Sequence, residues 1–488
     1  MGRVFSRIAA WFDDVVDLVA PLPAPEENID VHCHLFNLNT ALIYLMKGAI
    51  DVSARMLAEG STRAGGAAGD AAAPGETPPA AQPQDLAARS QEFLGYLRAA
   101  LVWLSSDSRK VYRYLRRRGG YRFTLVALSL DFDYHADAAA RDRFRAYFEK
   151  AMERLRPQLE KAGGPFARET SRLLAKFGDR IAACLDARLW SIDFYEQAEQ
   201  LARVARKYGG VYPFLAVDPR QPGILDYVKK RVGAGKDFRG VKIYCPMGYS
   251  PTDPLLFGRD GNDDCLYGYC VSNAIPVTTH CSPKGFGTAA DQVPVRGHIY
   301  VARGESVIVN DMPVTGDGPV EVDGVLRFKA NFPAANHYSV FQERSHVLNH
   351  PMIWGEVLRR YPDLRLDLAH FGEDAEMEQY VRDAGDNRAD ASKSWTKAIA
   401  CLTDAYENVY TDLACNSNYD VLRRMKTVLW DRGFLSDKVK SKVMYGSDWD
   451  VLLFLERDLN RYVSQFREIF GSEFDALSIA NPRRFLGL

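Results

Sequence analysis

The sequence predicts an α/β fold of the (β/α)8 barrel type, a TIM barrel, with two large insertions. Eight short apolar segments recur along the chain, most of them separated by stretches with helical periodicity. Strands that are apolar throughout are typical of a parallel sheet covered by helices on both faces. No predicted strand is followed by a Gly-x-Gly-x-x-Gly fingerprint, which weakens the competing prediction of a doubly wound, dinucleotide-binding sheet.

The predicted strands are short runs rich in apolar residues, several of which end at a polar residue. In chain order they are 29–34, 122–130, 211–217, 240–244, 275–280, 364–370, 409–413 and 442–448. The intervening stretches predict helices at 38–57, 86–115, 138–177, 192–208 and 224–232. A barrel of this type takes about 250 residues before insertions, so the remaining length needs a separate explanation.

Two insertions supply that length within a barrel domain expected to span 28–488. The first lies between the first two strands and includes 59–84, where a composition rich in Ala, Gly and Pro predicts a flexible surface loop. The second, 281–349, contains short alternating runs that predict a small β subdomain. Because it leaves the C-terminal end of a strand, we expect it to cover the barrel mouth as a lid, with a purely structural elaboration as the alternative.

Residues 1–27 are predicted to form an amphipathic helix that packs on the domain, with a peripheral membrane contact as the alternative. Asp13, Asp14 and Asp17 interrupt its apolar character, so it does not read as a signal peptide. No apolar run approaches the ~20 residues that span a bilayer. We therefore expect no transmembrane segment.

The bulk composition is that of an ordinary globular protein. Of its 488 residues 47% are hydrophobic and 26% charged, and the formal net charge of −1 offers no electrostatic footprint for nucleic acid. The eight cysteines are scattered without a CxxC pair. Reduced thiols in the cytoplasm are therefore the expectation.

Five residues of types that bind metals stand at or next to the C-terminal ends of four predicted strands. They are His32, His34, His280, His370 and Asp448. A single histidine at such a place is more often a hydrogen-bonded core or loop residue, but four of the nine histidines fall here. Neutral imidazoles with one carboxylate are the ligands expected for Zn²⁺ or a related divalent ion. Since the strand ends of a barrel converge, the sequence predicts a metal site at the barrel mouth.

These stretches resemble the amidohydrolase superfamily of metal-dependent (β/α)8 hydrolases. The chain looks most similar to the amidohydrolase-related branch that includes the aminocarboxymuconate-semialdehyde decarboxylase-like enzymes. The resemblance rests on IDVHCH at 29–34, VTTH at 277–280, YPDLRLDLAHFG at 361–372, YGSDW at 445–449 and ANPRRFLGL at 480–488. His-x-His alone is a weak motif, but the ordered set spans nearly the whole chain apart from the insertions.

The resemblance implies a role for each residue of the predicted site. His32, His34 and His280 would bind the metal, and Asp448 would complete the ligand set and take a proton from the attacking water. His370 would polarise or protonate the substrate. One ion, Zn²⁺ or another divalent metal, is expected rather than two. An adjacent carboxylate and a metal that acidifies water are a physically consistent pair.

Three further residues are predicted near the site. Lys242, on the fourth strand, would bridge two metals if carboxylated, contact an anionic substrate, or form a structural ion pair. Tyr244 and Trp449 follow the presumed site residues and would shape the substrate pocket, with packing as the equal alternative.

The other polar residues give weaker signals. We expect His135 to be a solvent-exposed loop residue and Asp412 to be a hydrogen-bond partner behind the ligands. Four histidines belong to the second insertion or its exit, and one of them would touch substrate: His298, His337, His346 and His350.

The sequence thus predicts a metal-dependent hydrolase that activates water to cleave an amide, ester or lactone bond of a small molecule. Non-oxidative decarboxylation of an aromatic or unsaturated carboxylic acid is the alternative reaction. A catalytically inactive barrel that acts as a binding protein is the alternative of another class. We expect a small-molecule substrate and no nucleic-acid partner, and a homodimer is left open.

Overall fold

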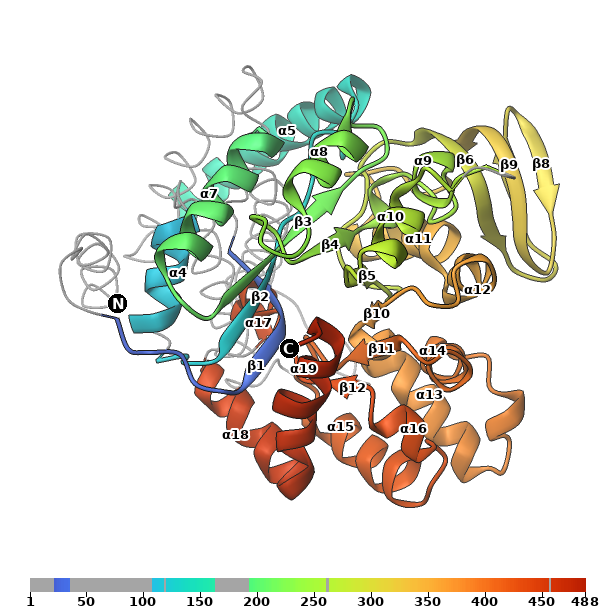
Figure 1. Cartoon of the computed structure of the whole chain (residues 1–488). Helices are drawn as coiled ribbons and strands as arrows, with labels where there is room; N and C mark the ends of the chain where they lie inside the picture. Colours follow the sequence, from blue (N-terminus) through green and yellow to red (C-terminus); the bar gives the residue numbers. More distant parts are fainter. Residues whose placement is uncertain (1–21, 36–107, 118–119, 163–192, 260–262, 456–457) are drawn as a thin grey trace, which may run out of the picture.

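A computed structural model describes residues 22–35, 108–117, 120–162, 193–259, 263–455 and 458–488. Figure 1 shows a central ring of strands surrounded by helices, with a smaller sheet projecting from one side. The predicted surface loop at 59–84 and most of the predicted helix at 1–27 lie outside the described residues.

The central sheet has eight parallel strands in the order β1-β2-β3-β4-β5-β10-β11-β12. Every neighbouring pair in this sheet is parallel. The strands are β1 (Ile29–His34), β2 (Thr124–Leu128), β3 (Val211–Val217), β4 (Gly240–Ile243), β5 (Val277–His280), β10 (Leu366–Ala369), β11 (Val409–Asp412) and β12 (Val443–Met444). All eight predicted strands are confirmed. Six of them are shorter than predicted, and apolar residues such as Leu130, Ile275 and Leu413 lie outside the strands.

Backbone hydrogen bonds close the sheet into a barrel between the first strand and the loop after the last. Val31 N donates to Tyr445 O at 3.1 Å, and Asp448 N donates to His32 O at 2.7 Å. The predicted (β/α)8 architecture is therefore present, and Asp448 is held directly beside His32.

Helices cover the outside of the barrel. On the side of β1 to β5 they are α4 (Ser108–Arg117), α5 (Ala138–Ala162), α7 (Phe194–Lys207), α8 (Ile224–Arg231), α9 (Pro254–Phe257) and α10 (Leu266–Ser272). The helices after residue 350 are α12 (Pro351–Arg360), α13 (Glu373–Gly385), α14 (Trp395–Ala405), α15 (Tyr419–Met425), α16 (Asp437–Lys440), α17 (Trp449–Leu455), α18 (Leu459–Phe470) and α19 (Asn481–Leu486), and of these α17 and α19 contact β1. Several begin at a side chain that accepts a hydrogen bond from a first-turn N–H, such as Asp193 before α7 and Ser394 before α14.

An apolar cluster from the barrel strands is covered by the C-terminal helix α19. Phe485 and Leu486 of this helix belong to the same buried cluster as Ile29, Val31 and Phe214 from the barrel strands. Asn481, at the start of α19, donates from Nδ2 to Val443 O at 2.6 Å and so fixes the helix to β12.

Gly240 on β4 lies directly against the ring of Phe214. A Cβ at this position would stand 2.5 Å from a ring carbon, closer than packed atoms tolerate. Gly240→Ala is therefore expected to lower the free energy of unfolding by about 1–3 kcal/mol, measured by urea denaturation. Gly209→Ala is the matched control, because no described atom lies within 4 Å of its added Cβ. Equal stability of the two variants would contradict this account of the packing.

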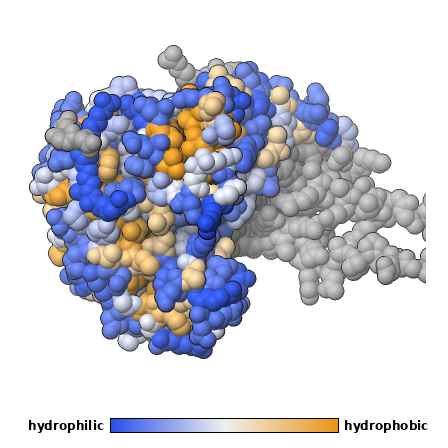
Figure 2. Space-filling view, turned by 90° about the vertical axis from the view of Figure 1, so that its right-hand side faces the viewer, coloured by the Kyte–Doolittle hydropathy of each residue, from blue (hydrophilic) through white to orange (hydrophobic). Residues whose placement is uncertain are grey.

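The second insertion contains a four-stranded antiparallel sheet in the order β6-β9-β7-β8. Its strands are β6 (Gln292–Val301), β7 (Ser306–Val309), β8 (Met312–Thr315) and β9 (Gly318–Arg327), and helix α11 (His337–Asn349) returns the chain to the barrel. The predicted small β subdomain is therefore present between β5 and β10. Met312 and Val325 of this sheet are exposed apolar side chains, and Figure 2 shows hydrophobic surface in the upper half of this side of the molecule.

No helix in the described ranges is long and apolar enough to cross a membrane. The seven described cysteines are all free, as the scattered cysteine pattern predicts.

Candidate metal centre

Four predicted site histidines converge where their strands end. The ring centroids of His32 and His370 lie 4.5 Å apart, those of His32 and His34 5.3 Å, and those of His280 and His370 4.7 Å. All four are buried, with exposures of 1–5%. The prediction that residues far apart in sequence meet at the barrel mouth is therefore confirmed for the histidines.

His32, His34 and Asp448 form one of two groups of potential ligands found among the described residues. One ligand atom from each lies within 4.8 Å of those of the other two. His34 donates from Nδ1 to Leu128 O at 2.9 Å, so the lone pair of its ring lies on Nε2, and this atom lies 3.4 Å from Asp448 Oδ1. The backbone carbonyl thus fixes the tautomer that a metal ligand needs.

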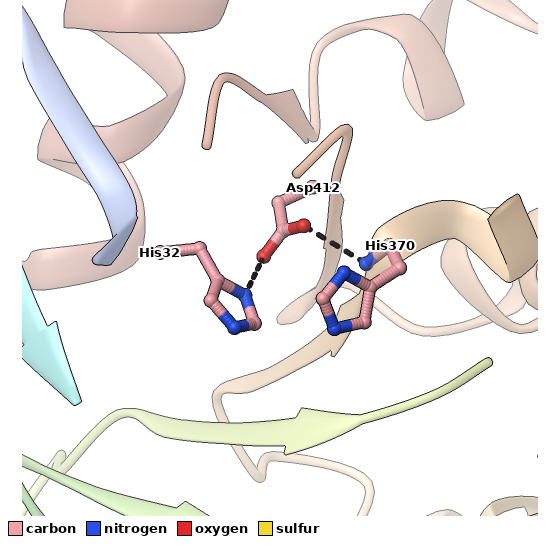
Figure 3. Close-up of side chains that lie close together, drawn as sticks. All are labelled: His32, His370 and Asp412. Carbon is pink, nitrogen blue, oxygen red and sulfur yellow. Dashed lines mark hydrogen bonds and ion pairs between the residues drawn. The ribbon is translucent and has the colours of Figure 1, made fainter. Parts of the chain in front are cut away.

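Asp412 holds His32 and His370 in place, as Figure 3 shows. Its Oδ2 accepts from His32 Nδ1 at 2.9 Å, and its Oδ1 accepts from the backbone N–H of His370 at 2.8 Å. Asp412 is thus a hydrogen-bond partner of both residues, while its predicted place behind the metal ligands stays a prediction. The three residues also form a second group of potential ligand atoms. Because both oxygens of Asp412 already accept hydrogen bonds, we assign this carboxylate to orienting His32.

His280 is held by the loop that follows β5. Its Nε2 donates to Lys284 O at 2.6 Å, and its ring stacks on Tyr244 with centroids 4.6 Å apart. A Cβ on Gly285 would approach the His280 ring to 2.7 Å, so the φ of +102° and the close approach both favour glycine there. The remaining ring atom, Nδ1, is buried and has no hydrogen-bond partner among the described residues.

The backbone is strained at the strand ends that carry the site. Three residues there adopt left-handed conformations that cost energy for any residue but glycine: His370 (φ 73°), Phe371 (φ 48°) and Asp448 (φ 51°). The hydrogen bonds from His370 N to Asp412 and from Asp448 N to His32 O hold these conformations. Such strain is commonly found at functional sites.

Lys242 enters the site from β4. Its Nζ lies 3.5 Å from His32 Nε2, and its side chain is fully buried. Burial lowers the pKa of Lys242 to about 8, against the opposing effect of Asp412, Asp448 and Asp367. Burial also raises the pKa of Asp367 well above its usual value, with the charge of Asp412 adding to the effect.

Burial keeps the four imidazoles in their neutral form. It lowers the pKa of His34 and of His280 to about 3, and the charge of Lys242 adds to the lowering. It also lowers the pKa of His32 and His370 well below the usual value. Neutral imidazole is the form that binds metal ions.

The residues present fit a divalent cation. His280 Nδ1 and Asp448 Oδ1 are buried acceptors without a hydrogen-bond partner in the described part of the chain, and such atoms are costly unless something binds them. Burial and the charge of Asp450 raise the pKa of Asp448 well above its usual value, a cost that a cation would offset. Imidazole nitrogens with one carboxylate suit Zn²⁺, Mn²⁺ and Fe²⁺.

Tyr244 and Trp449 make contacts that explain their burial. Tyr244 Oη accepts from Phe286 N at 2.9 Å, and Trp449 Nε1 donates to His34 O at 2.7 Å. Both residues therefore hold the segments that carry site residues. Their predicted part in binding substrate stays a prediction.

The expectation of an exposed His135 is wrong. Its side chain is 4% exposed, and its Nδ1 donates to Phe132 O at 2.6 Å. The loop of the second insertion packs over it, because Ala289 N and Thr288 Oγ1 both donate to His135 O. Burial lowers its pKa to about 4. The position of His135 after a predicted strand does not indicate that a loop of the insertion packs over it.

His298, His346 and His350, of the second insertion and its exit, belong to neither group of potential ligands. His350 stacks on Tyr300 with centroids 3.6 Å apart, and its ring lies 5.4 Å from that of His346. His298 lies beside Thr252. His337 begins α11.

Two positioning residues were missed by sequence reasoning. Asp30, fully buried, accepts from Ser447 N and Oγ, His32 N and Tyr121 Oη, at 2.5–3.1 Å. Asn349 Nδ2 donates to His280 O at 2.5 Å. Asp30 could have been found, because it lies inside the motif IDVHCH at 29–34. Asn349 lies in no motif that would have indicated its role.

A parallel eight-stranded barrel with histidines and a carboxylate at its strand ends defines the class of metal-dependent barrel enzymes. A family model described as Amidohydrolase (Amidohydro_2) matches residues 181–488, more than half of the chain. The chain belongs to this amidohydrolase family. No curated protein sequence matches it.

Solved structures of similar shape are distant in sequence. A dihydroxybenzoic acid decarboxylase from Polaromonas sp. JS666, with bound manganese and the inhibitor 2-nitroresorcinol, is 12% identical over 96% of this chain and 98% of that chain, with a TM-score of 0.41. A 2,6-dihydroxybenzoate decarboxylase from Rhizobium is 13% identical over 61% and 80%, with a TM-score of 0.33. Amidohydrolase 2 from Bifidobacterium longum subsp. infantis is 10% identical over 61% and 76%, with a TM-score of 0.32.

Proposed function

We propose that the protein is a metal-dependent enzyme in which His32, His34, His280 and Asp448 hold one divalent cation. The observation that carries this proposal is the group formed by His32, His34 and Asp448, in which Asp448 Oδ1 lacks a hydrogen-bond partner among the described residues. His280 would join through Nδ1, the ring atom that Lys284 O leaves available. A bound divalent cation would supply Lewis acidity to a substrate oxygen or to water.

We favour non-oxidative decarboxylation over hydrolysis, the reaction that the sequence put first, because of the charge around Lys242. A divalent cation and the Lys242 ammonium carry three positive charges, and the carboxylates of Asp412 and Asp448 offset two of them. With Asp367 as a neutral acid, the site keeps one positive charge. A substrate carboxylate would balance this charge, whereas a neutral amide or ester would not. Lys242 would therefore contact the substrate anion, which leaves no carboxylated lysine to bridge a second metal.

In this reaction the bond between the substrate carbon and its carboxylate breaks, CO₂ leaves, and the electron pair stays on the carbon. The carbon then takes up a proton that comes from water. His370, which faces both His32 and His280, would relay this proton, since burial keeps its own imidazole neutral. Burial of the site histidines excludes bulk water from this transfer.

Hydrolysis of an amide, ester or lactone is the second candidate. Asp448 Oδ1 favours it, because a carboxylate oxygen without a partner beside His34 can accept a proton from an attacking water. Lys242 would then contact an anionic part of the substrate remote from the bond that breaks.

The test compares CO₂ release from aromatic and unsaturated carboxylic acids with product release from amides, esters and lactones. We expect metal-loaded protein to release CO₂, and chelated protein to regain activity only when Zn²⁺, Mn²⁺ or Fe²⁺ returns. Lys242→Met is expected to raise the KM for the acid at least about tenfold, since a charged hydrogen bond is lost. Lys236→Met, which removes an exposed lysine outside the barrel, is the control.

Two results would overturn the proposal. Hydrolysis products without CO₂ would transfer the assignment to the second candidate. Protein that binds no metal and stays inactive with all three ions would support the third prediction, a binding protein on an inactive barrel.

A further inference from the structure

A basic cavity lies between helices α4 and α7, on the outside of the barrel. Its volume is about 500 Å³, and its lining residues are Arg109, Lys110, Gln200, Arg203, Val204, Lys207 and Tyr208. Figure 1 shows the two helices side by side. Ser108 N at the start of α4 donates to Gln200 Oε1 on α7 at 3.2 Å, so the two walls are joined.

Among the described residues that line this cavity, four are basic and none is acidic. Lys110, Arg203 and Lys207 form no ion pair with any residue in the described ranges. Arg203 and Lys207 stand four residues apart on α7, so their like charges face one another across one turn. Elsewhere on the same helix Arg206 does pair, with Asp237. The repulsion between the charges of Lys110, Arg203 and Lys207 is therefore not offset by an acidic side chain in the described ranges.

A phenol provides a neutral donor in the same wall. Tyr208 Oη is buried and has no hydrogen-bond partner among the described residues. Its ring is fixed, because it stacks on Tyr112 with centroids 4.7 Å apart, and Lys207 Nζ lies 5.6 Å from its centroid. A buried hydroxyl without a partner costs free energy that an oxygen acceptor from a ligand would recover.

A solvated helix face is the ordinary explanation for basic residues on a surface helix. The basic residues Arg116 and Arg117 in the last turn of α4 offer a comparison. Arg116 is buried there, donates to Tyr121 O at 2.9 Å and lies over the Tyr112 ring. The cavity differs in having volume, several cations and an unused hydroxyl together.

We propose that this cavity binds a small phosphorylated molecule through a diphosphate group. Lys110, Arg203 and Lys207 together carry more positive charge than a single phosphate needs, and arginine and lysine with a hydroxyl are the usual donors to phosphate oxygens. Val204 and the Tyr208 ring offer an apolar wall to the rest of the molecule. This site is separate from the barrel mouth, and it does not depend on the reaction proposed above.

Isothermal titration calorimetry of the full chain with pyrophosphate tests the proposal. We expect pyrophosphate to bind more tightly than inorganic phosphate, and binding to weaken as salt is added. The double variant Arg203→Gln/Lys207→Gln is expected to weaken pyrophosphate binding at least tenfold. Tyr208→Phe, which removes only the hydroxyl, is expected to weaken it severalfold, and this variant keeps the test usable if the double variant misfolds.

Lys230→Gln/Arg432→Gln is the matched control, because it removes the same charges from exposed positions elsewhere. Pyrophosphate that binds at the barrel mouth would be unaffected by the cavity variants, so the difference between variants reports the cavity alone. Titration with ADP distinguishes the sources: tighter binding than pyrophosphate indicates a nucleotide, and equal binding indicates the diphosphate group alone. Absence of binding, a preference for inorganic phosphate, or an equal loss in the control would overturn the proposal.

Discussion

Asp448→Asn is expected to lower the kcat of the metal-loaded protein about a thousandfold while the fold is kept. The amide has the shape of the carboxylate but cannot take a proton, and it is a poorer ligand beside His34. The backbone N–H of Asp448, which donates to His32 O, is untouched, so the loop keeps its place. The measurement is kcat with the identified substrate, together with metal content and thermal unfolding.

Asp450→Asn is the matched control for this variant. Asp450 is buried two residues further along, and burial raises its pKa to about 7, so the neutral amide resembles a form that the site already favours. We expect it to keep most of the activity. If Asp448→Asn retained turnover close to that of Asp450→Asn, the proposed role of Asp448 would be refuted.

Asp412→Asn is expected to weaken metal affinity about 10–100-fold. The carboxylate accepts from both His32 Nδ1 and His370 N, whereas an amide offers one acceptor and one donor. One of the two N–H groups would then face an NH₂ group, and the Nδ1–H tautomer of His32 would lose its support. Competition with a chromogenic chelator measures the affinity directly.

Asp404→Asn serves as the control for this second variant, because Asp404 is an exposed acid that pairs with Ser436 far from the histidines. Its metal affinity should equal that of the unmodified protein. An Asp412→Asn protein that binds metal as tightly as the control would show that His32 needs no support from this carboxylate.

The barrel could be predicted from sequence because each strand is a short apolar run. Such strands are stable only in a sheet that is buried on both faces. The convergence of His32, His34 and Asp448 could be predicted as well, since residues at strand ends must converge when a barrel closes. The insertion sheet was also predictable, from the alternation in β6 and β9.

The remaining details depend on contacts between distant loops. The burial of His135 comes from Thr288 and Ala289 of the insertion, which no local pattern reports. The attachment of His280 Nε2 to Lys284 O depends on a turn that Gly285 permits, and a glycine in a loop predicts many turns equally well. Strand ends came out too long because the sequence does not show where the ladder hydrogen bonds stop.

The closure of the barrel has a consequence for how the protein is made. Asp30 bonds to Ser447 across a separation of 417 residues, and His32 bonds to Asp412 across 380. Contacts of such separation form late, since the entropy of a very long loop must be overcome first. A nascent chain therefore carries His32 through the synthesis of 380 further residues, of which Asp412 is the last. The four proposed ligands are all present only after β12 and the loop that carries Asp448 have been added.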